Sequence, residues 1–223
     1  MKNLLICAAA MLIALAASAQ DGPTTTWPYL YPDFTQGTIY LLGGTTVVQD
    51  MNVHIRHDRL HYIDKGGVVK EAVLDEVMMV TIGDDRYVNV YGEMMKVIAE
   101  GEKKGLVVAE ILGDFSALLE TGGAYGVSST TSATRKLSSI ETDAQINQPH
   151  MLLKQSKTDG QMLNLITNYY IVTSKYRIKA TKKDVTASIP KDRQDEWKAW
   201  LKKNKIKWNK PGSLVAVADF LSE

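Results

Sequence analysis

Cysteine is almost absent from this sequence of 223 residues: Cys7 is the only one, and it lies within an apolar run at the start of the chain. Export would remove that run and leave no thiol in the mature protein. A chain without thiols has no disulfides, no cysteine nucleophile and no zinc–thiolate site. Its stability must therefore come from packing, and about 200 residues are enough to bury one sizeable core or two small ones.

Long hydrophobic runs are also missing. The apolar segment 4–16 is shorter than the about 20 residues that a transmembrane helix needs, and the small-residue pattern Ala17-Ser18-Ala19, which signal peptidase reads, follows it. We predict a signal peptide at residues 1–19, a mature chain without a transmembrane segment, and an exported protein of the periplasm. Secretion or attachment to the cell surface is the alternative.

Catalytic motifs are absent as well. The sequence has no phosphate-binding loop, no dinucleotide fingerprint, no calcium loop and no zinc-protease helix. Segment 126–130, GVSST, lacks the closing glycine of a nucleophile elbow, and adjacent carboxylates such as Asp84-Asp85 cannot face each other across a cleft as glycosidase chemistry requires. We expect no cofactor and a non-catalytic protein. A glycan-acting hydrolase without a recognisable motif is the alternative.

Charge is balanced overall but unevenly distributed. Residues 20–174 carry 12 basic and 19 acidic side chains, whereas residues 175–223 carry 13 basic and 6 acidic ones, which gives net charges of −7 and +7. Such a split indicates either a lysine-rich tail that docks on an acidic body or a patch that binds an anionic partner. An envelope lipid, an acidic polysaccharide or an acidic protein would suit the patch. Nucleic acid is disfavoured because the chain is exported.

Segment 37–112 predicts a run of antiparallel strands. Short stretches rich in Val, Ile, Tyr, Thr and Met alternate with Gly or Asp turns at intervals of about ten residues, without a helical pattern between them. The predicted strands are residues 38–42, 46–56, 59–63, 68–72, 77–82, 86–90, 94–100 and 106–112. The fold class is therefore α+β, with an antiparallel β barrel or curled sheet followed by a small C-terminal helical unit.

The remainder of the chain divides into a loop and a mixed region. Residues 113–150, and above all the Gly/Ser/Thr tract 121–134, predict a long flexible loop. Strand patterns return at residues 151–154, 162–173 and 176–179, and helical patterns follow at residues 181–188, 190–204 and 211–221. The predicted units are the signal peptide at 1–19, a β domain at 20–112, the loop at 113–150, and β-hairpin strands with basic helices at 151–223.

Histidines in the predicted hairpin 52–63 have the spacing of metal ligands. A tight turn at His57-Asp58 would pair His54 with His61, close enough for the two imidazoles to share one metal ion. The same register would place four residues on the core face, namely Val53, Ile55, Leu60 and Tyr62. His54 and His61 are only weak metal candidates, because two flanking arginines would repel a cation and no third ligand is evident. We expect a solvent-exposed polar face instead.

Aromatic residues gather at both ends of the mature chain. The prolines and aromatics of segment 27–32 favour an extended lead that wraps the core, with a carbohydrate site as the alternative. Trp197 and Trp200 lie three residues apart and predict the core face of a helix. Tryptophans interleaved with lysines can also bind sugars or anions where they are exposed. The candidate partner-binding residues are Tyr125, Lys202, Lys203, Lys207 and Trp208.

Several segments resemble a known group of proteins. They are the signal ending Ala-Ser-Ala-Gln, the strand run 37–82, the tract 123–134 with the sequence GAYGVSSTTSAT, and the tail 180–208. Together they look like uncharacterised exported proteins of Bacteroidota-type bacteria, which implies the periplasm of a Gram-negative cell and supplies no activity or catalytic residue. The strand run is also similar in rhythm to small SH3-like barrels. That similarity implies a binding or envelope-associated module rather than an enzyme.

Overall fold

A computed structural model of the chain describes residues 22–24, 26–116, 146–157 and 160–223. The predicted signal peptide, Tyr125 and the tract 121–134 lie outside these residues. The strands are β1 (Thr35–Leu41), β2 (Thr46–His54), β3 (Arg59–Ile63), β4 (Val69–Glu71), β5 (Val77–Ile82), β6 (Asp85–Val90), β7 (Glu93–Glu100), β8 (Leu106–Gly113), β9 (Leu165–Val172) and β10 (Arg177–Lys179). The helices are α4 (His150–Gln155), α5 (Lys182–Ser188), the 3-10 turn η2 (Lys191–Arg193), α6 (Gln194–Lys203) and α7 (Pro211–Leu221).

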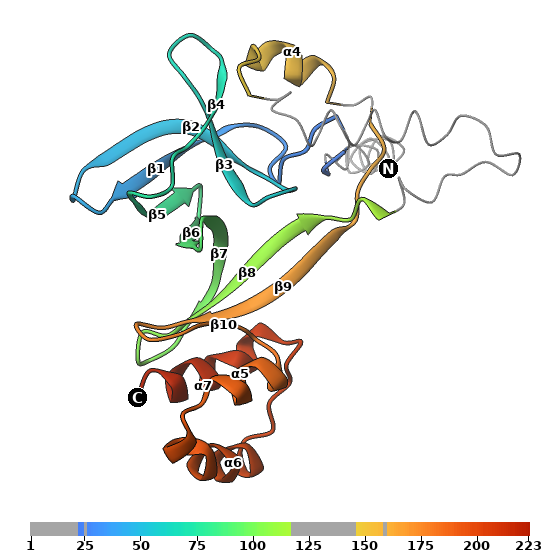
Figure 1. Cartoon of the computed structure of the whole chain (residues 1–223). Coiled ribbons are helices and arrows are strands. Elements are labelled where there is room, and N and C mark those ends of the chain that lie inside the picture. Colours follow the sequence, from blue (N-terminus) through green and yellow to red (C-terminus); the bar gives the residue numbers. More distant parts are fainter. Residues whose placement is uncertain (1–21, 25, 117–145, 158–159) are drawn as a thin grey trace, which may run out of the picture.

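The strands form one antiparallel sheet in the order β10-β9-β8-β7-β6-β5-β1-β2-β3-β4, and the sheet curls without closing (Figure 1). The α+β class and the curled sheet are therefore confirmed, and a closed barrel does not form. β1 to β4 make one meander and β5 to β8 another, and β1 joins them because it pairs with both β2 and β5. Strands 59–63 and 77–82 have the predicted ends, and the other predicted ends in segment 37–112 differ by at most three residues.

Alternation along β2 and β3 separates two buried faces. Met51, Val53 and Leu60 point to one side of the sheet, belong to one buried apolar cluster and are at most 1% exposed. Asn52, His54 and His61 point to the opposite side, and they are also buried. The first face is the predicted apolar core, whereas the burial of the second face was not predicted.

Segment 27–34 covers this second face. The backbone N–H of Leu30 donates to the carbonyl of Val53, and that of Ile55 donates to the carbonyl of Pro28, both over 2.9 Å. The Asn52 amide fixes the segment further, because its Oδ1 accepts from the backbone N–H of Tyr31 and its Nδ2 donates to two carbonyls of the segment. Trp27 and Tyr29 are fully buried, so this lead wraps the core as predicted and does not present its indole to a carbohydrate.

The predicted register of the β2–β3 hairpin is wrong. His54 opposes Arg59 and Asn52 opposes His61, whereas a tight turn at His57-Asp58 would have placed the two histidines opposite each other. The chain reverses through the longer turn 55–58, in which Asp58 takes a positive φ of 47°. Asp is one of the few residue types that adopt this left-handed region readily.

The predicted strand 151–154 is also wrong, because these residues belong to helix α4. The helix begins after Pro149 and buries only one residue, Leu153, whereas Met151 and Leu152 are 63% and 57% exposed. A short apolar run does not distinguish a strand from a single buried helical position by its period alone.

The C-terminal unit, defined as residues 175–223, packs its helices on the end of the sheet formed by β8, β9 and β10 (Figure 1). Trp197 is fully buried there, its indole N–H donates to Thr186 Oγ1 over 3.0 Å, and its ring stacks on Trp200 at 5.3 Å. The predicted core role of this tryptophan is confirmed. No helix among the described residues has the length and apolar character needed to cross a membrane.

Docking of the C-terminal unit on the sheet is apolar rather than electrostatic. In the described parts of the chain, one ion pair joins residues 175–223 to the rest, and it pairs Lys103 of the body with Glu223 of the unit. In this pair the lysine belongs to the body and the carboxylate to the C-terminal unit, which is the reverse of what a lysine-rich tail docked on an acidic body would show. The lysines of the unit are therefore not used to hold it in place.

Gly105 allows α7 to approach the β7–β8 turn. A Cβ atom at this position would lie 2.7 Å from the carbonyl oxygen of Ala218, which is backbone and cannot turn aside. We predict that Gly105→Ala lowers the free energy of unfolding by about 1–3 kcal/mol through overpacking, measured by urea unfolding. Gly43→Ala is the matched control, because a Cβ there meets nothing within 4 Å. Equal losses in the two variants would contradict this account.

Candidate functional site

The C-terminal unit presents a set of lysines without acidic partners. Every lysine of the unit is exposed, and within the described residues only Lys198 forms an ion pair, with Asp195 at 3.1 Å. The unpaired lysines are Lys175, Lys179, Lys182, Lys183, Lys191, Lys202, Lys203, Lys205, Lys207 and Lys210. Their charge is not compensated locally, and it produces a positive potential that attracts anions.

A hollow of about 290 Å³ lies between the sheet and the link that connects α6 to α7, and we name it the Trp208 hollow. Three segments contribute to it, namely β9, the end of β10 with the start of α5, and the link. The lining residues are Thr167, Asn168, Tyr169, Lys179, Ala180, Thr181, Trp208 and Asn209. Polar and aromatic side chains therefore predominate over aliphatic ones in this hollow.

Backbone hydrogen bonds hold the three segments in place. Lys179 pairs with Tyr170 across the β9–β10 ladder, and the N–H of Ala180 donates to the carbonyl of Tyr169 over 2.8 Å. In the link, the N–H of Lys207 donates to Ser213 Oγ over 2.9 Å, and the N–H of Lys210 donates back to the carbonyl of Lys207 over 3.0 Å. Trp208 and Asn209 lie at the centre of that closed turn, so their positions relative to β9 and β10 are fixed.

The chemistry of the Trp208 hollow is that of a hydrogen-bond donor site. Lys179 is the only charged residue that lines it, and no carboxylate does. The Trp208 indole N–H, the Asn209 amide and the Lys179 ammonium have no hydrogen-bond partner among the described residues. Donors without partners around an aromatic surface suit a ligand that is rich in acceptors and negatively charged.

The structure brings together only part of the predicted partner-binding set. Trp208 lines the hollow and Lys207 precedes it, whereas Lys202 and Lys203 lie at the end of α6, where Lys203 lines a different groove. Tyr125 is not among the described residues. Sequence reasoning missed Lys179, Asn209 and Tyr169. The hairpin predicted from strands 162–173 and 176–179 could have indicated Lys179, because such a hairpin brings residue 179 beside residue 170.

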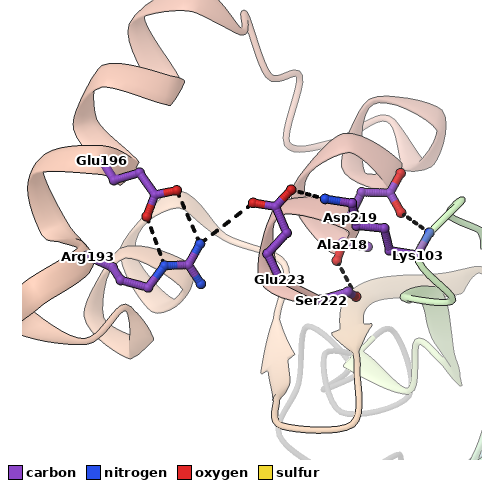
Figure 2. Close-up of polar contacts among 7 residues, drawn as sticks. All are labelled: Lys103, Arg193, Glu196, Ala218, Asp219, Ser222 and Glu223. Carbon is purple, nitrogen blue, oxygen red and sulfur yellow. Dashed lines mark hydrogen bonds and ion pairs between the residues drawn. The ribbon is translucent and has the colours of Figure 1, made fainter.

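The groove between α6 and α7 is larger, at about 470 Å³, and carries three carboxylates at its rim. All three carboxylates have partners, as Figure 2 shows. Arg193 binds Glu196 at 2.9 Å and reaches Glu223 at 3.9 Å. Lys103 Nζ also contacts Glu223, and the backbone N–H of Lys103 donates to Asp219 over 2.9 Å. The hydrogen bond from Arg193 lowers the pKa of Glu196. Glycoside hydrolysis needs a carboxylic acid of raised pKa, and Glu196 has the opposite shift.

The two histidines that were candidates for metal binding do not lie on an exposed polar face, so that expectation is wrong. His54 and His61 are 4% and 3% exposed, because segment 27–34 covers them. The Tyr29 hydroxyl lies 2.8 Å from His61 Nδ1, and burial lowers the pKa of His54 to about 3 and that of His61 to about 4. Across the described residues, no group of three His, Cys, Asp or Glu side chains could hold a metal ion.

Asp58 is a buried carboxyl group that the sequence did not single out. It is 1% exposed, and one of its oxygens, Oδ2, has no hydrogen-bond partner among the described residues. Burial, together with the nearby charges of Glu110 and Glu93, raises its pKa to about 8. A substrate cannot reach a side chain that is closed off in this way, so we assign Asp58 a structural effect and no catalytic one.

No family model, no curated protein and no solved structure matches this chain. The described residues combine an open antiparallel sheet with a lysine-rich helical unit, and the unit contains a donor-lined hollow.

Proposed function

We propose that this protein is an exported, non-catalytic binding module that engages an anionic component of the cell envelope or an acidic protein through its C-terminal unit. The observation that carries the proposal is the set of ten exposed lysines that have no acidic partner in the described residues. Lysines that served only solubility would be expected to alternate with acidic residues over the whole surface, whereas here they concentrate on one unit.

Rigid presentation of these lysines supports the proposal further. The unit is anchored by buried apolar residues, among them Val185, Trp197 and Leu214, which pack with Val107 of β8 and Ile171 of β9. A partner that binds the lysines therefore meets a preformed backbone surface, and the entropy cost of ordering falls on the exposed lysine side chains.

A glycan-acting hydrolase is the less supported function. Its support would be an open cleft with two carboxylates, one of them a proton donor. The α6–α7 groove has the carboxylates, but Arg193 and Lys103 pair with them. Among the described carboxyl groups of raised pKa, Asp58 is closed to solvent and Glu93 does not line this groove. The binding module therefore explains more of the observed geometry.

Removal of four lysines tests the proposal. We predict that changing Lys202, Lys203, Lys205 and Lys207 together to Gln weakens binding to heparin–agarose by about a hundredfold or more at low salt, since a lysine near an anionic surface contributes about 1 kcal/mol. The measurement is frontal chromatography over a range of salt concentrations. The matched control changes four lysines of the body to Gln and alters the net charge equally: Lys65, Lys70, Lys104 and Lys154.

The body variant is expected to retain nearly all of the affinity. Equal weakening in both variants would show that only net charge matters, and absence of salt-dependent retention of the unaltered protein would overturn the proposed function. Export is checked separately by the mass of the protein recovered from cells, which should correspond to a chain that begins at Gln20.

A further inference from the structure

We infer that the Trp208 hollow is a subsite for one acidic sugar residue, so that the anionic partner is a polysaccharide that carries carboxylate groups. The inference rests on the proposed function and names its ligand. It depends on the size of the hollow, on its aromatic and hydrogen-bonding side chains, and on the lysines around it.

The size of the hollow fits a single small unit. Its volume of about 290 Å³ is at the lower limit of small-molecule sites, which run from about 300 to 1,000 Å³. A cofactor or a folded peptide would not be enclosed by it. One residue of a longer chain can enter, while the rest of that chain runs over the surrounding surface.

Two aromatic rings provide the surface on which a sugar ring would lie. Trp208 and Tyr169 are only partly buried, and both pack against the apolar core of the C-terminal unit while they line the hollow. Rings held in this way lose little freedom when a ligand binds. Their apolar faces suit the C–H surface of a sugar, and the indole N–H of Trp208 remains available as a donor.

Charge selects an acidic sugar over a neutral one. Lys179 lines the hollow, Lys182 and Lys183 directly follow its lining residue Thr181, and Lys207 and Lys210 flank Trp208-Asn209 in the link. A carboxylate on the bound sugar can accept a charge-assisted hydrogen bond from the Lys179 ammonium. Further acidic residues along the polysaccharide meet the neighbouring lysines, and the sugar hydroxyls can accept from the Asn209 amide.

The surface around the hollow favours a glycan over a membrane. Proteins that lie in a bilayer interface insert exposed apolar side chains beside their basic residues. Within the described residues, none of the large exposed apolar side chains belongs to segment 175–223, and those nearest the hollow in the chain are Leu165 and Ile166 of β9, 42% and 45% exposed. A lipid headgroup could contact the lysines, but the lysine-bearing segment 175–223 itself has no large exposed apolar side chain that would enter the acyl layer.

Calorimetric titration with three probes tests the inference: oligogalacturonate, an uncharged oligogalactose of the same length, and vesicles of phosphatidylglycerol. The unaltered protein is expected to bind oligogalacturonate and to bind the neutral oligosaccharide at least about tenfold more weakly. Trp208→Ala should weaken oligogalacturonate binding by about tenfold or more, as loss of an enclosed aromatic contact does, and Trp208→Phe should restore part of it.

Charge variants complete the test. Lys179→Gln should weaken oligogalacturonate binding strongly, whereas Lys191→Gln, which removes another exposed lysine that does not line the hollow, should leave it nearly unchanged. Circular dichroism verifies the fold of each variant. If Trp208→Ala does not fold, Lys179→Gln tests whether the hollow binds the sugar. This variant is expected to fold, because the Lys179 side chain is exposed.

Failure of the inference differs from failure of the proposed function. If the protein is retained on heparin–agarose while Trp208→Ala and Lys179→Gln bind oligogalacturonate as well as the unaltered protein, the hollow is not the subsite and the binding module stands. Binding to vesicles with no binding to oligogalacturonate would likewise overturn the inference in favour of a membrane. Loss of all salt-dependent retention would instead overturn the proposed function.

Discussion

Replacing Trp197 by alanine is expected to lower the free energy of unfolding by about 3–5 kcal/mol, the range for truncating a buried aromatic side chain. Trp197 is fully buried, and its ring lies 5.3 Å from that of Trp200 and 5.1 Å from that of Phe220. Truncation would leave a cavity beneath α6 and α7, and the Thr186 hydroxyl would lose the indole N–H that it accepts.

The loss should extend into the sheet. Trp197 belongs to the same buried cluster as Val107 of β8 and Ile171 of β9, so the helices and these strands share one core. Urea unfolding followed by circular dichroism should show one transition shifted to lower urea. Lys198→Ala changes the neighbouring exposed position of α6 and should shift it by less than about 0.5 kcal/mol. A Trp197→Ala loss below about 1.5 kcal/mol would contradict the shared core.

Much of the sheet could be predicted from the sequence, because its strands are short, alternate, and end at Gly or Asp turns. The register of the β2–β3 hairpin was not predicted correctly, and the cause is local to its turn. The turn, in which Asp58 adopts a positive φ, is two residues longer than predicted, and the cross-strand partner of every residue in the hairpin shifts by two. Residue types alone did not distinguish this turn from a two-residue one at His57-Asp58.

Burial of the polar face of β2 and β3 could not be predicted from strand periodicity. Alternation correctly places Leu60 and His61 on opposite sides, but it does not show what covers each side. Segment 27–34 covers His61, and Tyr29 and Asn52 supply the contacts. An expectation of exposure therefore failed even though the alternation was right.

The candidate site, too, could be predicted only in part from the sequence. The excess of lysine in residues 175–223 is evident from the sequence, whereas the Trp208 hollow needs three segments that the chain separates by up to about 40 residues. Trp208 was identified because it lies among lysines. Lys179 and Asn209 could not be joined to it, because no spacing rule relates the end of a hairpin to a link between two later helices.

Stability is expected to be greatest near pH 6.5 and to fall on both sides. His54 and His61 have pKa values of about 3 and about 4 in the folded protein, because burial disfavours their charged forms, whereas an unfolded histidine titrates at 6.5. Between pH 6.5 and 5 the unfolded chain therefore binds protons at both histidines that the folded chain does not. Acidification stabilises the unfolded state accordingly.

Asp58 acts in the opposite direction. Its pKa is about 8 in the folded protein, against the usual 3.8, so above pH 4 the folded chain holds a proton that the unfolded chain has released. Each group contributes about 1.4 kcal/mol per pH unit. Below pH 6.5 the two buried histidines outweigh Asp58, so stability falls on acidification, and from pH 6.5 to 8 Asp58 makes stability fall as the pH rises.

Asp58→Asn separates these contributions, and asparagine also tolerates the positive φ at this position. The free energy of unfolding of the variant should not decline between pH 6.5 and 8. Over that range the variant should therefore gain about 2 kcal/mol on the unaltered protein. Its stability should fall more steeply on acidification below pH 6.5, because Asp58 no longer opposes the two histidines. Urea unfolding at half-unit steps from pH 5 to 8 measures the free energy of unfolding on both sides of pH 6.5.

Two outcomes would contradict this account. An unchanged decline of stability above pH 6.5 in the variant would show that Asp58 is ionised in the folded protein. Constant stability below pH 6.5 would show that His54 and His61 are not closed off by segment 27–34.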